Sequence, residues 1–215
     1  MIMPIGDEGP VRRIVPIVTY ALIALNVLFF FVELSGGESF IKHWAVIPRQ
    51  LVNNPGGEFP TVFTSMFMHG GWVHLLGNML YLWIFGDNVE DRLGHARFLI
   101  FYLLCGITAV AAQVAVSTAS TLPNLGASGA IAGVLGAYMV MFPHRRVRVL
   151  TRGGVMLIPA FAAIGIWILL QFVSIAPIDP EAQTGGVAYM AHIGGFIAGL
   201  VLSYVFRGGG GQRAI

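Results

Sequence analysis

The sequence predicts an all-α integral membrane protein, a bundle of six transmembrane helices with both termini in the cytoplasm. Hydrophobic residues make up 56% of the 215-residue chain and charged residues only 10%, whereas soluble domains carry about 25% charged residues. The apolar residues gather in six long segments, and most basic residues lie on one side of them. The mean hydropathy of +0.79 agrees with both observations.

The six apolar segments are close to the length of about 20 residues that a helix needs to cross a bilayer. The fourth is the shortest, so we expect it to begin below the membrane surface. The first is too long for a secretory signal and has no cleavage site after it, so we expect it to be retained. In chain order the segments are residues 14–33, 61–85, 98–117, 128–142, 155–175 and 187–206.

These segments divide the chain into three parts. We expect residues 1–13 to be a short cytoplasmic N-terminus, residues 14–206 to be the six-helix membrane domain, and residues 207–215 to be a flexible cytoplasmic tail. The connection between the first two spans, residues 35–60, is too apolar for a simple linker. We expect it to be partly ordered at the membrane interface.

Basic residues indicate the orientation, because lysine and arginine gather in cytoplasmic loops. With the N-terminus inside, ten of the twelve basic residues are cytoplasmic, and only Lys42 and Arg49 lie outside. Spans two, four and six then all run from outside to inside. They place His74, Ser128 and His192 in one layer of the outer half of the bilayer, where ionisable side chains are costly and usually functional.

Ser128 stands between Gly126 and Gly129 at the start of the fourth segment. Two roles are open for it. Its hydroxyl can cap the helix, or it can act as a nucleophile on a tight turn. The glycines let the backbone bend and let another group approach. The free N–H groups of the helix N-terminus also suit a developing oxyanion.

His192, near the start of the sixth segment, is the candidate base for this serine. A lone helical histidine is often only a packed core residue, but inside a membrane span a function is favoured. Gly195 and Gly199 form a small-residue face on this segment, and Gly129 begins a similar face on the fourth. Two such faces allow close helix packing, which would bring His192 within hydrogen-bonding distance of Ser128.

Span two contains His69, His74 and Asn78. His74 and Asn78 are four residues apart and share a helix face, where both can donate hydrogen bonds to an anionic oxygen. A metal site is the alternative for such histidines, but no acidic residue of this span completes a ligand set. We therefore expect no metal and no other cofactor, and we assign His69 a structural role at the helix start.

Several other classes of function lack support in the sequence. The basic residues form no long run, so we expect no nucleic-acid binding. Cys105 is the single cysteine, which excludes an intrachain disulfide and a cysteine-rich zinc site. A transporter or channel is an alternative for a polar layer inside a membrane, but the spans contain no acidic relay and no paired repeat.

The motifs together resemble those of the rhomboid intramembrane serine proteases, over nearly the whole chain. The loop after span two, with Glu90 and Arg92, is similar to a Glu-x-Arg element of that family that is thought to be structural. The matching patterns, in this order on spans two, four and six, are HxxxxHxxxN (His69, His74, Asn78), GxSG (Gly126, Ser128, Gly129) and AHxxG (Ala191, His192, Gly195).

The resemblance implies a catalytic dyad of Ser128 and His192 with no acidic third member. His74, Asn78 and the backbone N–H of Ser128 would form the oxyanion hole. The resemblance also implies that the substrates are transmembrane proteins, cut in or near their spans within the cell membrane. The residues expected to support the site are Gly126, Gly129, Gly195 and Gly199. The residues expected to line a lateral gate for the substrate on the fifth span are Trp167, Gln171 and Phe172.

The chain departs from the family pattern at two places. Many members carry an aromatic residue one turn after the serine that stacks on the histidine, and here that residue is Ala132. Many carry Trp-Arg in the first outer loop, where this chain has Pro60 and Thr61. The alternative function is a catalytically inactive rhomboid-like protein that binds membrane clients. Such relatives usually lack the serine or the histidine, and both are present here.

Overall fold

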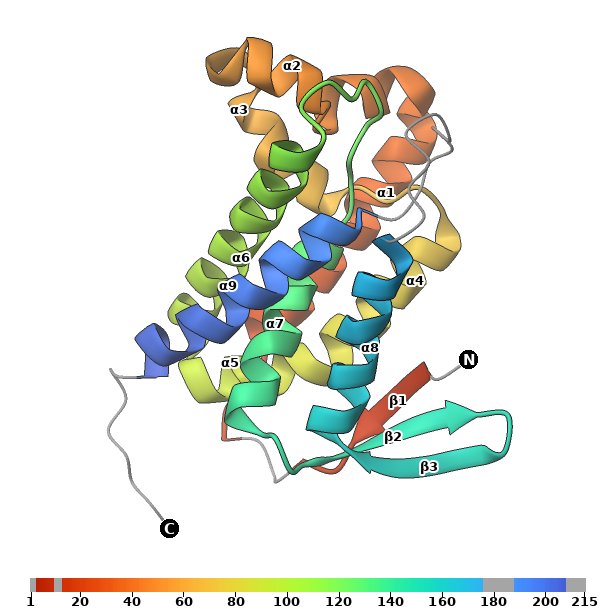
Figure 1. Ribbon diagram of the computed structural model, residues 1–215, viewed down its shortest axis with the longest axis vertical. Coiled ribbons are helices and arrows are strands. Elements are labelled where there is room, and N and C mark those ends of the chain that lie inside the picture. The colour runs from red at the N-terminus through yellow and green to blue at the C-terminus, as the bar shows by residue number, and fades with distance from the viewer. Residues whose placement is uncertain (1–2, 10–12, 176–187, 208–215) are drawn as a thin grey trace.

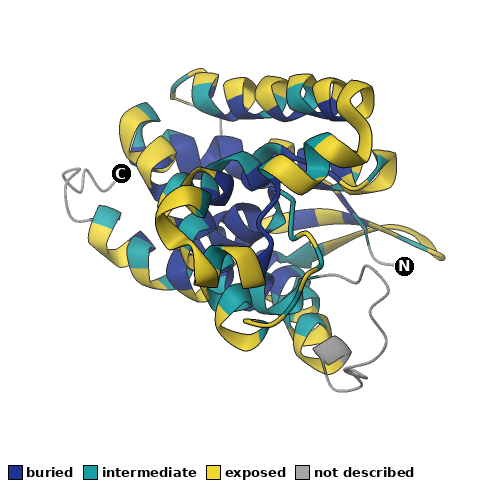
Figure 2. Cartoon of the chain, turned by 90° about the horizontal axis from the view of Figure 1, so that it is seen from above, coloured by how far each residue is buried: buried dark blue, intermediate teal, exposed yellow. Residues whose placement is uncertain are grey.

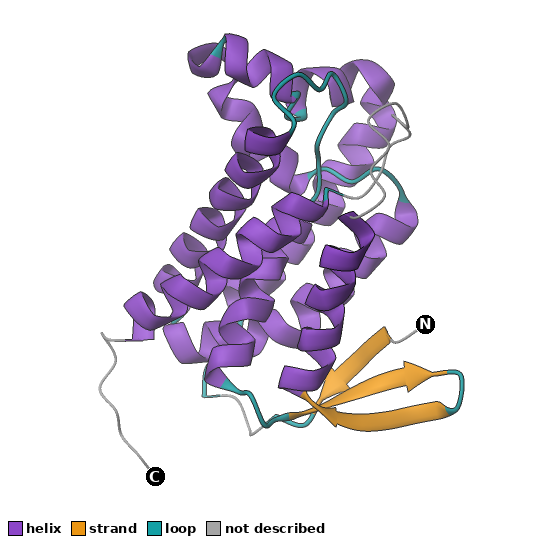
Figure 3. Ribbon diagram, viewed as in Figure 1, coloured by secondary structure: helices purple, strands orange, loops and turns teal. Residues whose placement is uncertain are grey.

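Helices make up most of the structure, and a small sheet lies at one end of the helical bundle (Figure 3). The computed structural model describes residues 3–9, 13–175 and 188–207, so residues 208–215 of the predicted tail lie outside the described part. The elements in chain order are β1 (Met3–Asp7), α1 (Ile17–Trp44), α2 (Pro48–Asn53), α3 (Pro55–Thr64), the 3-10 turn η1 (Ser65–Phe67), α4 (Trp72–Tyr81), the π-helical turn η2 (Leu82–Gly86), α5 (Asp87–Leu93), α6 (His95–Val116), α7 (Ser128–Met141), β2 (Arg146–Thr151), β3 (Gly154–Pro159), α8 (Ala160–Ile175) and α9 (Tyr189–Arg207).

Five of these helices are apolar enough to belong to a membrane domain. Within the described residues, α1, α6 and α9 have the length and composition to cross a membrane, and α7 and α8 are shorter apolar helices. The predicted connection 35–60 is ordered, because α1 resumes after a kink at Gly37 (φ +61°) and continues to Trp44, and the short helices α2 and α3 follow it. The prediction of a mainly helical membrane protein is therefore confirmed.

The second apolar segment begins later than predicted. Residues 61–64 belong to α3 and are followed by a turn and a loop, so the helix that contains His74 starts only at Trp72. From there α4, η2 and α5 follow one another without a break to Leu93. Gly94 ends this run with φ +79° and precedes α6 directly. Glycine is the usual residue at such a left-handed helix end.

The prediction of an all-α chain was wrong at one end of the bundle. The strands β1, β2 and β3 form an antiparallel sheet in that order. Residues 155–159, which were counted in the fifth span, are a strand, and the helix begins at Ala160. In β2 the valines 147 and 149 are buried and the arginines between and before them are exposed. This period-two alternation is the strand signal that the apolar count missed.

Helix α7 lies at the centre of the bundle. It is buried from Gly129 to Tyr138, as the dark core of Figure 2 illustrates. Helix α9 crosses directly over it, α8 lies beside it, and α2 and α3 lie at the end opposite the sheet (Figure 1). The α7–α9 crossing has no room for side chains, because a Cβ atom added to Gly136 would lie 2.5 Å from the carbonyl oxygen of Phe196. Such contacts are the small-residue packing that was predicted.

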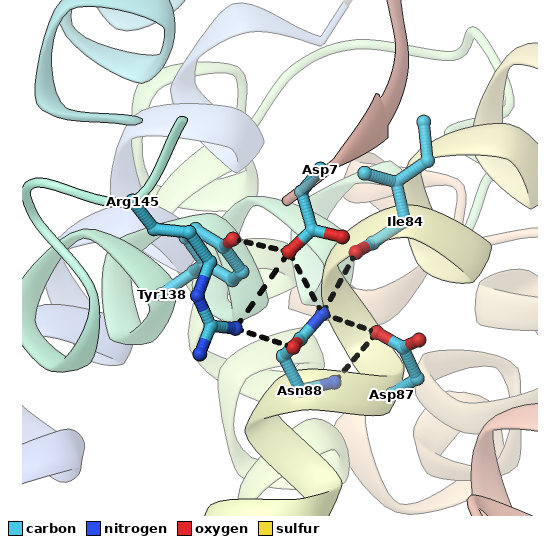
Figure 4. Close-up of polar contacts among 6 residues, drawn as sticks. All are labelled: Asp7, Ile84, Asp87, Asn88, Tyr138 and Arg145. Carbon is cyan, nitrogen blue, oxygen red and sulfur yellow. Dashed lines mark hydrogen bonds and ion pairs between the residues drawn. The ribbon is translucent and has the colours of Figure 1, made fainter. Parts of the chain in front are cut away.

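A polar cluster joins the sheet to the helices (Figure 4). The carboxylate oxygen Oδ2 of Asp7 in β1 accepts a hydrogen bond from the Tyr138 hydroxyl at 2.6 Å and one from Nδ2 of Asn88 at 3.2 Å. The guanidinium of Arg145 lies 3.7 Å from the same oxygen and donates to Oδ1 of Asn88. The N-terminal strand is thus held to the end of α7 and to α5.

Glu90 ties α5 to the start of α1. Its side chain is fully buried, and its carboxylate accepts hydrogen bonds from the backbone N–H groups of Val18 at 2.9 Å and Thr19 at 2.7 Å. The Thr19 hydroxyl donates a further bond of 2.6 Å, and Nδ1 of His95 lies 2.6 Å away. A carboxylate in this position satisfies free N–H groups of the helix and complements its dipole.

We expect Glu90→Ala to lower the free energy of unfolding by about 3 to 5 kcal/mol, because it leaves buried N–H groups without acceptors. Thermal unfolding in detergent would measure the loss. Glu38→Ala is the matched control, because Glu38 lies on α1 and has an exposed carboxylate that pairs with Lys42 at the surface. Equal unfolding temperatures for the two variants would contradict the capping role.

Candidate active site

Ser128 opens α7 after a turn that only glycine accommodates. Gly126 has φ +133°, and its backbone N–H donates to the carbonyl of Ser65 at 2.9 Å. A Cβ atom at Gly126 would lie 2.9 Å from the ring of His74 and 3.5 Å from Oγ of Ser128. The loop before this turn, residues 117–127, descends into the bundle before α7 begins (Figure 3). The serine therefore starts a helix inside the bundle, as its short segment suggested.

His192 lies in the first turn of α9 and is buried. Its Nε2 atom lies 2.9 Å from Oγ of Ser128, which is hydrogen-bonding distance. The close packing of α7 and α9 brings the two residues together across 64 positions of sequence. A base at this distance can take the proton of a serine that attacks a carbonyl.

The opposite edge of the His192 ring contacts α8. Its Nδ1 atom lies 2.7 Å from Oε1 of Gln171, and the Trp167 ring packs on it at a centroid distance of 5.6 Å. From the sequence these two α8 residues were predicted only to line a gate, so neither contact with His192 was foreseen. One signal was available, because Gln171 is a polar side chain in an otherwise apolar helix, and such residues usually have a partner.

His74 lies in the first turn of α4 with its ring directed toward the serine. Its Nδ1 atom accepts a long hydrogen bond of 3.4 Å from the Gly70 backbone N–H. The other edge of the His74 ring carries Cε1 and Nε2. Both atoms would lie 2.9 Å from a Cβ atom added at Gly126, beside Ser128. A neutral imidazole that accepts at Nδ1 carries its proton on Nε2. His74 therefore presents a donor to the space next to the serine.

Asn78 lies one turn after His74 on α4 and is buried. Among the described residues, its Nδ2 atom has no hydrogen-bond partner. Buried amide donors are rarely left unpaired in proteins, so each instance calls for an explanation. One explanation fits this site: the Asn78 amide donor is held free for an anionic oxygen of a substrate.

His69 is buried just before α4, and its backbone N–H donates to the buried carboxylate of Glu33 at 2.9 Å. The backbone N–H of His69, and not its ring, thus ties the start of α4 to α1. The His69 ring meets the His74 ring edge-on at 5.1 Å. Across the part of the chain that the structure describes, His, Cys, Asp and Glu side chains form no group of three suited to a metal ion.

Comparison with known families identifies the family of this chain. The Rhomboid domain family matches residues 56–209, which include every motif residue of the site. The chain belongs to the rhomboid family. Rhomboid protease GluP of Bacillus subtilis is 33% identical over 205 residues, which cover 93% of this chain and 38% of GluP.

Two further relatives have different lengths. YdcA of the same bacterium is 29% identical over 90% of this chain and 89% of its own length. Rhomboid protein 1, mitochondrial, of Saccharomyces cerevisiae is 28% identical over 86% of this chain and 52% of its own. This rhomboid chain thus spans about half or less of the length of two of these relatives, GluP and the yeast protein.

The two departures of this rhomboid sequence from the family pattern have structural counterparts. Ala132 is fully buried inside α7 and carries no ring, so the aromatic contact of His192 comes from Trp167 on α8 instead. Thr61 lies in α3 and donates a hydrogen bond to the Glu58 carbonyl at 2.6 Å. The ordered helices α2 and α3 therefore form without the Trp-Arg pair.

Proposed function

We propose that this protein is an intramembrane serine endopeptidase that cuts transmembrane protein substrates in or near their spans. The observation that supports this most directly is the 2.9 Å approach of the Ser128 hydroxyl to Nε2 of His192. Membership of a family with relatives named proteases supports the same reaction class. The proposal includes six spans with cytoplasmic termini, in which α4, η2 and α5 together supply the second, and a location in the cell membrane.

In the proposed reaction, Oγ of Ser128 attacks the scissile carbonyl while Nε2 of His192 takes the hydroxyl proton. The oxyanion accepts hydrogen bonds from His74, Asn78 and the backbone N–H of Ser128. His192 then gives the proton to the leaving amine, and water repeats the sequence to release the acyl group. The reaction needs no cofactor.

The test is reaction of purified protein with a fluorophosphonate, which captures activated serines, and with a fluorescent single-span substrate. We expect one phosphonylated residue, Ser128, identified by mass spectrometry, and cleavage that the same reagent blocks. A chain that binds the substrate but neither cuts it nor reacts at Ser128 would instead support the inactive client-binding protein. The Ser128→Ala variant, treated in the same way, controls for contaminating proteases.

We expect His74→Ala and Asn78→Ala each to lower kcat by about two to three orders of magnitude, because one oxyanion donor is worth about 2.7–4 kcal/mol of barrier. KM should change little, since the oxyanion forms only in the transition state. Steady-state cleavage kinetics would measure both constants. His144→Ala, which changes an exposed histidine beyond the end of α7 opposite Ser128, is the control. A rise in KM with unchanged kcat would contradict the oxyanion assignment.

A further inference from the structure

The edge of the His192 ring that faces away from Ser128 is held by one turn of α8. Nδ1 of His192 lies 2.7 Å from Oε1 of Gln171. Trp167, four residues earlier on the same helix face, packs against the ring. A neutral side chain thus occupies the position at which an acidic residue orients the histidine of many serine proteases.

Hydrogen bonds determine which way the Gln171 amide faces. Its Nε2 atom donates to the backbone carbonyl of Trp167 at 3.2 Å. A carbonyl oxygen can only accept, so the amide nitrogen must face it, and the amide oxygen then faces His192. The network, and not an arbitrary choice between oxygen and nitrogen, therefore assigns the amide orientation.

The amide orientation in turn determines the tautomer of His192. Oε1 of Gln171 can only accept, so the proton of the neutral imidazole must lie on Nδ1. Nε2 then carries the lone pair, and this atom lies 2.9 Å from Oγ of Ser128. One chain of hydrogen bonds therefore runs in a single donor-to-acceptor direction, from the Ser128 hydroxyl through His192 and Gln171 to the Trp167 carbonyl.

We propose that Gln171 is a positioning residue that holds His192 in the tautomer and orientation needed to accept the Ser128 proton. This inference rests on the proposed protease function. When Oγ bonds to the substrate carbonyl carbon, its proton moves to Nε2, and Nδ1 keeps its own proton and its hydrogen bond to Gln171. No proton moves to the amide, so Gln171 orients the base without taking part in the transfer.

The positioning residue also links the base to α8. The contacts that Gln171 and Trp167 make with the His192 ring come from one turn of that helix. The other face of the helix is exposed, with Leu169, Phe172 and Val173 more than half exposed. The base is therefore correctly oriented only while this turn of α8 lies against α9. If α8 moved and carried Gln171 away, the protein would remain folded, but the His192 ring would be poorly oriented.

The test compares Gln171→Leu, which removes the acceptor, with Gln171→Glu, which keeps an acceptor oxygen whether ionised or protonated. We expect the leucine variant to lower kcat and the rate of fluorophosphonate labelling about tenfold, the value of one hydrogen bond, with KM unchanged. The glutamate variant should restore most of the loss. Leu169→Ala, on the exposed face of the same helix, is the matched control.

A second measurement does not depend on activity. In ¹⁵N-histidine NMR spectra, the His192 signals are those that disappear in His192→Gln. We expect them to report protonated Nδ1 in the wild type and a mixture of tautomers in Gln171→Leu. An unchanged tautomer, or a change in KM alone, would overturn the positioning role. If Ser128 is never labelled, the protease function fails, and the NMR comparison still decides the role of Gln171.

Discussion

Ser128→Ala is expected to lower kcat for cleavage of a transmembrane substrate by about four to six orders of magnitude. Without the hydroxyl no acyl-enzyme forms, and only substrate binding and the oxyanion donors remain. His192→Ala should cause a loss of similar size, because a serine without its base is a weak nucleophile. The double variant should be little worse than either single one, since residues that act as a unit are not additive.

The matched control for the serine is Ser203→Ala. Ser203 is a buried serine on α9, and its hydroxyl donates to the Leu200 carbonyl at 2.7 Å, toward the other end of that helix from His192. Thermal unfolding would establish that the Ser128 and His192 variants remain folded. Substantial cleavage by a folded Ser128→Ala protein, with none by a mock purification, would refute the serine mechanism.

Gly199→Leu is expected to have the largest effect on the fold. A Cβ atom at Gly199 would overlap the carbonyl oxygen of Gly133 and would lie 2.6 Å from its backbone carbon atoms. These are backbone atoms, so no side-chain rotation relieves the clash, and α9 must move away from α7. We expect a loss of about 3 kcal/mol or more in stability, at the upper end of the cost of overpacking.

The same displacement should impair the proposed catalysis, because α7 and α9 also carry Ser128 and His192. A shift of about 1 Å can cost about two orders of magnitude in rate. Gly165→Ala is the control: no atom beyond the adjoining backbone of α8 lies within 4 Å of the added Cβ, so α8 should tolerate it or gain slightly. Unfolding temperature and kcat would be measured for both. Equal values for Gly199→Leu and wild type would contradict the backbone contact.

Most of the helices could be predicted because their signals are local. Long apolar runs predict α1, α6 and α9, and glycines at four-residue spacing predict the close approach of α7 and α9. The motif residues His74, Ser128 and His192 also stand out, since polar side chains in apolar segments are few. Neighbouring residues alone carry this information.

The sheet and the start of the fifth apolar helix were harder to predict. Strand β1 is stable only when it pairs with β2, more than 135 positions later, and nothing in residues 3–7 alone indicates that partner. Residues 155–159 are apolar and equally compatible with a span or a strand. Their pairing with β2 favours the strand, because it satisfies the backbone N–H and C=O groups of these residues, which lie before the helix start at Ala160.

The sequence alone was sufficient for the protein class and for the residue types of the candidate site, because composition, apolar length and polar residues in apolar segments can be counted along the chain. Other features depend on how the helices pack. They are the 2.9 Å contact of Ser128 with His192, the support of the His192 ring by Gln171 and Trp167, and the capping of α1 by Glu90. Hydrogen bonds require positions accurate to a few tenths of an ångström. Such positions arise only when helices distant in sequence meet at a particular rotation and depth.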